Sequence, residues 1–190
     1  MLVHLLACLD PDQGRVTARR VEWICLESFP GILPFHGLGQ MTPEELASVY
    51  PLRRRAHGAL FQLAHRADQA FALKDRTALT RLANEGPCPL PPLPGAAARW
   101  LAEYPETGLG RLQTLILDGV ARGCRTPLEL QDHVARADTP PRFWGDTHLW
   151  VLINGLAQGD APRLRIQGPE PRLPQWESCL DLSQFSISMC

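Results

Sequence analysis

The stretch from Leu109 to Gln167 constrains the fold most, because it combines three helix signals with a strand signal. Apolar residues recur there at spacings of three and four over 111 to 121 and again over 146 to 156, which places them on one face of a helix. These residues are Leu112, Leu115, Ile116, Val120, Leu149, Leu152, Ile153 and Leu156. Arg163-Leu164-Arg165-Ile166 then alternates polar and apolar side chains, as a half-buried strand does.

The middle helix of this stretch has the clearest start, at Thr126-Pro127-Leu128-Glu129. The Thr126 hydroxyl can accept a hydrogen bond from the Glu129 amide, and the Glu129 carboxylate can accept one in return. Pro127 suits the first helical position, where no backbone donor is needed. Gly123 is expected to end the preceding helix, and Gly145-Asp146 to cap the following one. Three short helices followed by a strand form the order of a winged helix-turn-helix.

Residues 36 to 105 are predicted to form a helical region. Thr42-Pro43-Glu44-Glu45 is a second capping box. Helices are expected over 43 to 50, 56 to 73, 75 to 83 and 96 to 103. The Pro-rich segment Gly86 to Gly95 is predicted to be an extended joint of polyproline type.

The first 35 residues give weaker signals. Residues 2 to 9 are apolar without a clear period and fit either a helix end or a buried strand, whereas residues 21 to 27 are predicted to be a strand. A single strand in a mostly helical chain lacks a partner. We therefore interpret residues 1 to 35 as the remnant of an N-terminal α/β domain.

The predicted fold class is mainly α (α+β), in four parts. The remnant helix-strand piece over 1–35 precedes the helical region over 36–105, which contains the joint at 86–95. A winged-helix-like module over 106–167 follows. The tail over 168–190 either adds an edge strand or lacks order.

The charge of the chain is nearly balanced, with 19 Lys and Arg against 20 Asp and Glu, a net charge of −1. The positive charge is concentrated in residues 51 to 82, where seven basic residues face two acidic ones, a local charge of +5. Arg53, Arg54, Arg55 and Arg66 form a candidate basic patch in this segment, although a solvated charged face is the simpler interpretation. The predicted winged helix lies outside it.

The cysteine pattern and the hydropathy indicate a cytoplasmic protein. Six cysteines without CxxC spacing favour reduced thiols over a disulfide framework. No apolar run approaches the roughly 18 residues of a membrane span, and Met1 to Leu9 is too short and lacks the preceding basic residue of a signal peptide.

No group of residues predicts catalysis, a cofactor or a metal. Gly37-x-Gly39 before a helix could hold a phosphate, but Glu44 repels an anion there and the third Gly and the P-loop Lys are missing. His36 could act as an acid or a base, but a surface or capping position is the simpler interpretation. Asp146 and His148 have no third metal ligand nearby in sequence. We therefore expect no catalytic residue, cofactor or metal.

The third helix of the module decides between a DNA contact and a protein contact. The candidate nucleic-acid or partner-binding residues are Arg142, His148, Trp150, Asn154, Gln158, Arg163 and Arg165. Residues 146 to 162 contain no Lys or Arg, which phosphate contacts require. Trp150 and Val151 favour a packed or protein-facing surface.

Several strings in the chain resemble an uncharacterised bacterial family that is described as a domain of unknown function. These strings are Phe35-His36-Gly37-Leu38-Gly39-Gln40-Met41-Thr42-Pro43-Glu44-Glu45-Leu46, Arg99-Trp100-Leu101-Ala102-Glu103-Tyr104-Pro105, Gly108-Leu109, Arg125-Thr126-Pro127-Leu128-Glu129-Leu130 and Phe143-Trp144-Gly145-Asp146. The resemblance covers residues 1 to 166. It implies a Rossmann-like N-terminal half and a helical, winged-helix-like C-terminal half.

Two departures from the family pattern matter. Members of the family carry a Glu-His-Asp string upstream of the segment that matches Leu2 to Leu9, and an Arg-Thr-Glu run where this chain has Arg111-Leu112-Gln113. The resemblance therefore implies a truncated chain, a misplaced start or a degenerate relative.

The predicted function is a non-catalytic binding or protein-interaction module, which contacts an unknown protein partner or a second copy of itself. Nucleic acid is a less favoured partner, and no membrane contact is expected. A winged-helix DNA-binding transcriptional regulator is the alternative function. A fragment of an enzyme whose catalytic N-terminal half is absent is the second alternative.

Overall fold

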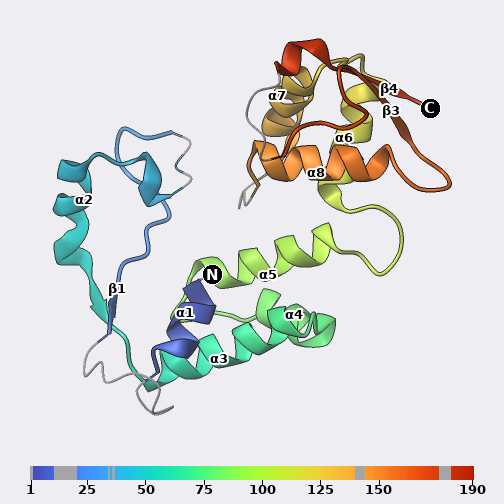
Figure 1. The fold of residues 1–190 in the computed structure, drawn as a ribbon. Coiled ribbons are helices and arrows are strands. Elements are labelled where there is room, and N and C mark those ends of the chain that lie inside the picture. The colour runs from blue at the N-terminus through green and yellow to red at the C-terminus, as the bar shows by residue number, and fades with distance from the viewer. Residues whose placement is uncertain (1, 11–20, 34, 36, 140–143, 176–180) are drawn as a thin grey trace. The chain divides into compact units, whose positions relative to one another are not determined.

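The computed structural model describes residues 2–10, 21–33, 35, 37–139, 144–175 and 181–190. This part of the chain contains eight α-helices and two two-stranded antiparallel sheets (Figure 1), so the predicted mainly α class is confirmed. The chain divides into two compact units, the N-terminal unit Met1–Leu101 and the C-terminal unit Ala102–Cys190. Each unit has its own hydrophobic core. None of the described helices combines the length and the apolar composition needed to cross a membrane.

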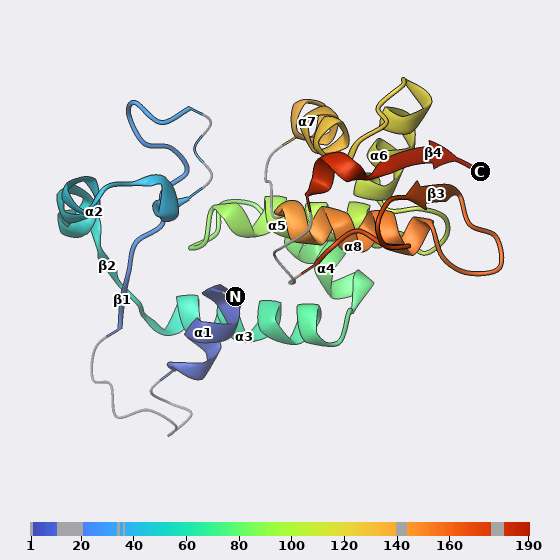
Figure 2. The ribbon, with the colours of Figure 1, turned by 45° about the horizontal axis from the view of Figure 1, so that its top comes forward.

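Helix α1 (Leu2–Cys8) lies against α3 (Gly58–Ala72) in the N-terminal unit, as Figures 1 and 2 show. Residues 2 to 8 are therefore helical, which decides between the two structures that the sequence allowed. Leu6 and Ala7 face the core of the unit and are 2% and 6% exposed. Helices α4 (Arg76–Ala83) and α5 (Pro92–Glu103) follow α3 in the chain.

The strand expected over 21 to 27 is much shorter than predicted and has a partner. Strand β1 (Glu22–Trp23) pairs antiparallel with β2 (Arg54–Arg55), with Glu22 opposite Arg55. The expectation of an unpaired strand is therefore wrong. The sequence did not show the partner strand because its two consecutive arginines lack the alternation of polar and apolar residues that predicts a strand.

Helix α2 (Pro43–Val49) lies between these two strands in sequence and is flanked by the 3-10 turns Leu38–Gln40 and Tyr50–Leu52. Its predicted capping box is confirmed. The Glu45 amide donates to the Thr42 hydroxyl (3.2 Å), and the Thr42 amide donates to the Glu45 carboxylate (2.8 Å).

The prediction of an extended joint over 86 to 95 is wrong for its last four residues, because α5 already begins at Pro92. Proline is tolerated in the first turn of a helix, where the backbone amide has no intrahelical partner. Leu93 lies between the prolines of this turn and is only 5% exposed. Burial of Leu93 thus favours helix where proline content alone suggested an extended chain.

The C-terminal unit contains three helices followed by a two-stranded antiparallel sheet, and the order of the helices and the first strand is the predicted one. The helices are α6 (Arg111–Ala121), α7 (Pro127–Ala137) and α8 (Asp146–Leu156). Strand β3 (Leu164–Gln167) pairs antiparallel with β4 (Ser186–Met189), so the tail supplies the edge strand that was one of its two expected states. A 3-10 turn, Leu182–Gln184, precedes β4.

The starts of α7 and α8 both lie where the sequence predicted them, but the Asp146 side chain does not cap α8. The Glu129 amide donates to the Thr126 hydroxyl (3.3 Å), and the Thr126 amide donates to the Glu129 carboxylate (3.0 Å). The hydrogen bond from the Arg125 amide (2.7 Å), and after it that from the Thr126 amide, hold the pKa of the Glu129 carboxylate below its usual range. At α8, Gly145 occupies the cap position and Asp146 is the first helical residue, so Asp146 is not the cap.

Candidate functional site

The structure separates the residues predicted to contact nucleic acid or a partner. Trp150 and Asn154 are each 4% exposed and belong to the core of the C-terminal unit. The Asn154 side chain donates to the Leu173 carbonyl (2.9 Å) and accepts from the Leu173 amide (2.7 Å). Because these bonds use both ends of its amide group, Asn154 is a structural residue and does not reach a base.

The remaining predicted residues form no concentrated basic surface. His148 is half-buried, whereas Gln158, Arg163 and Arg165 are exposed. Arg142 lies outside the described residues. The C-terminal unit contains eight Lys and Arg against eleven Asp and Glu, a net charge of −3. This charge opposes approach to a polyanion.

The predicted basic patch is divided between elements, and two of its four arginines are ion-paired. Arg53 donates to the Glu22 carboxylate (3.1 Å) and lies 4.2 Å from the centroid of the Tyr50 ring. Arg66, on α3, pairs with Glu85 (2.9 Å). Arg54 and Arg55 are exposed on β2. The four residues therefore do not act as one cluster of cations.

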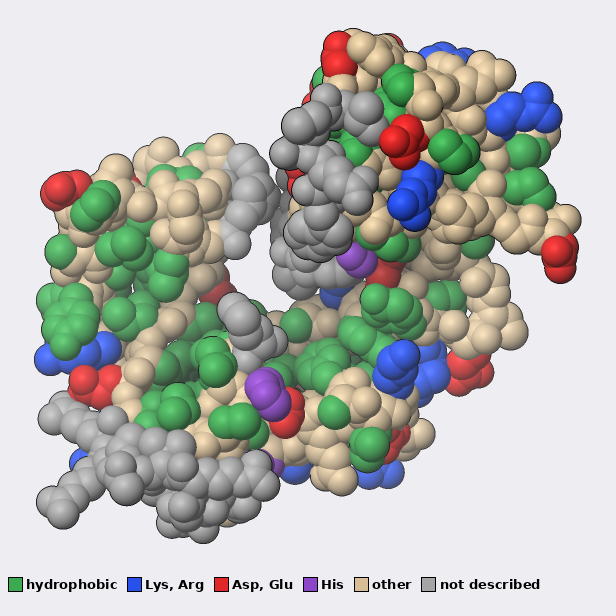
Figure 3. Space-filling view, viewed as in Figure 1, with side chains coloured by type: hydrophobic (Ala, Val, Ile, Leu, Met, Phe, Trp, Pro, Cys, Tyr) green, Lys and Arg blue, Asp and Glu red, His purple; other side chains and the backbone are tan. Residues whose placement is uncertain are grey.

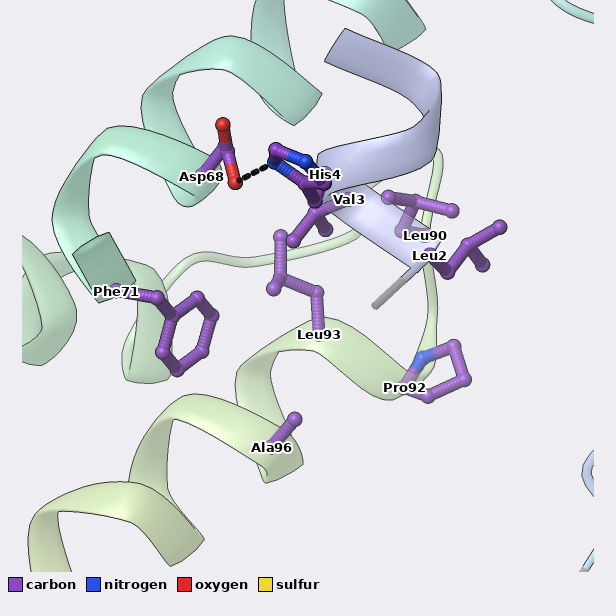
Figure 4. Close-up of a pocket in the computed structure, with 9 residues that line it drawn as sticks. All are labelled: Leu2, Val3, His4, Asp68, Phe71, Leu90, Pro92, Leu93 and Ala96. Atoms are coloured by element: carbon purple, nitrogen blue, oxygen red, sulfur yellow. Dashed lines mark hydrogen bonds and ion pairs between the residues drawn. The ribbon is translucent and has the colours of Figure 1, made fainter. Parts of the chain in front are cut away.

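An apolar pocket of about 330 Å³ lies in the N-terminal unit between α1, α3 and the start of α5 (Figure 4). Its walls consist of Leu2, Val3, His4, Asp68, Phe71, Leu90, Pro92, Leu93 and Ala96. In Figure 4 the Phe71 ring and the Leu93 side chain face the same space from α3 and α5. Only His4 and Asp68 bring polar groups to this apolar wall.

The two polar groups of the pocket wall are joined to each other and to a thiol. His4 Nδ1 lies 3.1 Å from Asp68 Oδ1, and His4 Nε2 lies 3.7 Å from Cys8 Sγ. When Nδ1–H donates to the Asp68 carboxylate, Nε2 carries the lone pair that accepts from the Cys8 thiol. A second pair, His65 with Asp10 (2.9 Å), also joins α3 to the residues at the end of α1.

Sequence reasoning missed this site for a physical reason. His4 and Cys8 are four residues apart, which is a signal only once residues 2 to 8 are known to be helical. Asp68 is 64 residues from His4, and their proximity follows from the packing of α1 on α3. The i, i+4 spacing of a His and a Cys was the only local sign available.

Other charged clusters of the described residues are surface or structural features. Asp118 accepts from Arg122 (2.7 Å) and lies 3.1 Å from His133 Nε2; the hydrogen bond from Arg122 is the main reason why the pKa of Asp118 is below its usual range. A polar groove between α3 and α4 contains the Arg66–Glu85 pair. Within the described part of the chain, no three His, Cys, Asp or Glu side chains are grouped so as to hold a metal ion.

Comparisons of the chain with protein-family models, with curated proteins and with solved structures find no match. The family resemblance inferred from the sequence therefore stays a prediction, and the function rests on the site itself.

Proposed function

We propose that this chain is a binding module for protein partners, whose N-terminal unit holds an apolar side chain of a partner segment in the pocket between α1, α3 and α5. The pocket is the observation that carries the proposal. Its volume of about 330 Å³ and its mostly apolar wall with two adjacent polar groups match the usual properties of ligand sites. A buried apolar anchor beside a few polar contacts is also the common form of a binding hot spot.

Exposed apolar residues on α1, one in the pocket wall and one outside it, favour a protein partner over an isolated small molecule. Leu2 and Leu5 on α1 are 42% and 48% exposed. Figure 3 shows hydrophobic side chains gathered on the face formed by α1 and α5. A peptide segment would cover this rim as well as fill the pocket, which removes more apolar surface from water than the pocket alone can.

The Asp68 carboxylate in the pocket wall indicates which polar group of the partner should lie beside its apolar side chain. The Asp68 side chain is 31% exposed and carries a carboxylate, which accepts hydrogen bonds only. We infer a partner segment in which a backbone or side-chain N–H lies beside an apolar residue such as Leu or Phe. A carboxylate at that position would be repelled by Asp68.

An NMR titration with N-acetyl-leucine N-methylamide tests the pocket as a site for an apolar residue. We expect saturable shift changes in the wild-type protein and binding weakened by at least about tenfold in Ala96→Phe, because the added ring fills the pocket. Ala98→Phe is the matched control, since Ala98 is exposed on the same helix and does not line the pocket. Equal weakening by both variants, or by neither, would contradict the proposal.

For the C-terminal unit we propose a winged-helix-like fold that serves protein interaction or structural support. The order of three helices and a two-stranded antiparallel sheet supports it. A further support is the hydrogen bond from the Ile187 amide to the Arg125 carbonyl (2.7 Å), which joins β4 to the α6–α7 connection.

A DNA-binding regulator is the second candidate for this unit. One observation favours it: Arg163 and Arg165 are both exposed and, two residues apart, project on the same side of the chain at β3. The net charge of −3 and the burial of Asn154 place it behind the protein-interaction proposal.

A further inference from the structure

We propose that Cys8 is a nucleophilic thiol that accepts an acyl group from an acyl thioester, with His4 as its general base and Asp68 as a positioning residue. The three side chains lie in the order nucleophile, base and carboxylate, with 3.7 Å from Cys8 Sγ to His4 Nε2 and 3.1 Å from His4 Nδ1 to Asp68 Oδ1. This order activates hydroxyl and thiol nucleophiles in unrelated folds. This chemistry goes beyond the binding role and lies beside the pocket, whose wall includes His4 and Asp68 but not Cys8.

Packed elements hold this geometry. His4 and Cys8 are one turn apart on the same face of α1, which brings their side chains together. The burial of Leu6 and Ala7 fixes α1 on α3, and α3 supplies Asp68. The Asp10–His65 pair also holds the end of α1 on α3. Cys8 therefore meets an oriented imidazole.

The activation must come from His4, since the helix itself opposes it. Cys8 is the last residue of α1, and the C-terminal end of a helix disfavours a negative charge nearby. Only the transfer of the thiol proton to Nε2, which leaves an imidazolium next to the sulfur, compensates for that effect. In contrast, the Cys88 thiol donates to the carbonyl of Leu90 (2.9 Å), a group that does not act as a base.

The class of substrate follows from the apolar pocket, because His4 and Asp68 belong both to the proposed catalytic group and to the pocket wall. An apolar acyl chain fits between Phe71 and Leu93, and its reacting carbonyl would then lie near α1. The choice of an apolar acyl chain rests on the proposed binding function of the pocket. The activation of the Cys8 thiol does not depend on it.

The reaction is an acyl exchange between two sulfur atoms. The Cys8 sulfur forms a bond to the acyl carbon, and the C–S bond of the thioester breaks. The thiol proton passes to His4 Nε2 and from there to the leaving thiolate. The products are S-acyl Cys8 and a free thiol, so no oxidant or reductant takes part.

Competitive alkylation with iodoacetamide at pH 7 tests the thiol. We expect Cys8 to react about tenfold faster than Cys190 in the same sample, as an activated thiol does, although Cys190 is exposed and Cys8 is only partly so. His4→Gln should abolish the difference, and Asp68→Asn should shift the pH profile of the Cys8 rate. His65→Gln is the control, because it removes the other His–Asp pair between the same elements. A Cys8 rate no higher than that of Cys190, or equal losses in both His variants, would overturn the proposal.

Acylation of the full chain by octanoyl and acetyl thioesters of N-acetylcysteamine tests the substrate class. We expect a hydroxylamine-labile octanoyl adduct on Cys8, absent in Cys8→Ser, and a selective slowing of octanoyl transfer in Ala96→Phe. Equal rates for both thioesters would overturn the placement of the acyl chain in the pocket, but not the nucleophilic role of Cys8. Pocket binding of the leucine amide without any adduct on Cys8 would overturn the acyl transfer while leaving the binding module.

Discussion

Asn154 fixes the chain after β3 to the core of the C-terminal unit. Its side chain makes two hydrogen bonds to the backbone of Leu173, and Leu173 is fully buried. The backbone groups of Leu173 depend on Asn154 because a buried amide or carbonyl without a partner is costly. Asn154, a buried polar residue of α8, therefore has a structural role.

Asn154→Ala should lower the free energy of unfolding of the C-terminal unit by about 2 to 6 kcal/mol, because it leaves two buried backbone groups unpaired at about 1 to 3 kcal/mol each. Urea denaturation followed by NMR signals of this unit measures the loss. Gln158→Ala is the control, since exposed Gln158 should change stability by less than about 0.5 kcal/mol. Equal effects of the two variants would show that Asn154 does not hold Leu173 in place.

At the scale of elements, one helical glycine lies at a tight helix crossing and another lies at an open surface. A Cβ at Gly119 in α6 would lie 2.8 Å from Leu130 Cδ2 and 2.9 Å from His133 Cδ2 of α7. A Cβ at Gly155 in α8 would meet no atom within 4 Å. The close approach of α6 and α7 therefore depends on Gly119.

Gly119→Ala and Gly155→Ala should change stability in opposite directions. Alanine favours a helix over glycine by about 1 kcal/mol at most, and overpacking a core costs about 1 to 3 kcal/mol. We therefore expect Gly119→Ala to lower the midpoint of thermal unfolding and Gly155→Ala to raise it slightly. A change of the same sign in both variants would contradict the tight crossing.

The elements that the sequence predicted well depend on local interactions. The capping boxes at Thr42 and Thr126 satisfy amides within three residues, so the four-residue string contains the whole cause. The start of α5 at Pro92 and the state of residues 2 to 8 depend on burial of Leu93, Leu6 and Ala7 against distant segments. Local propensity does not include that burial, which is why these two predictions were wrong or left open.

At the scale of the whole molecule, the site depends entirely on tertiary packing. The pocket combines residues from position 2 to position 96, and no pair from α1 and α5 is close in sequence. The charge is also divided between the units: the N-terminal unit has eleven basic and nine acidic residues, whereas the C-terminal unit has a net charge of −3. The distribution of charge could be read from the sequence, but the site could not.

This charge distribution predicts that the protein does not bind duplex DNA through the C-terminal unit. A fluorescence titration with labelled duplex at about 50 mM salt should show no saturable binding, since phosphate contacts depend on Lys and Arg. Binding that weakens steeply with added salt and is lost in an Arg163→Ala, Arg165→Ala double variant would instead establish the regulator.

The central claim is that an apolar side chain enters the pocket between α1, α3 and α5, and intermolecular NOEs from N-acetyl-leucine N-methylamide test it most directly. We predict NOEs from the leucine methyl groups to Phe71, Leu93 and Ala96, and none to Gln69 or Ala78 in the polar groove. NOEs confined to other residues, or no NOE at a saturating concentration of the amide, would contradict it.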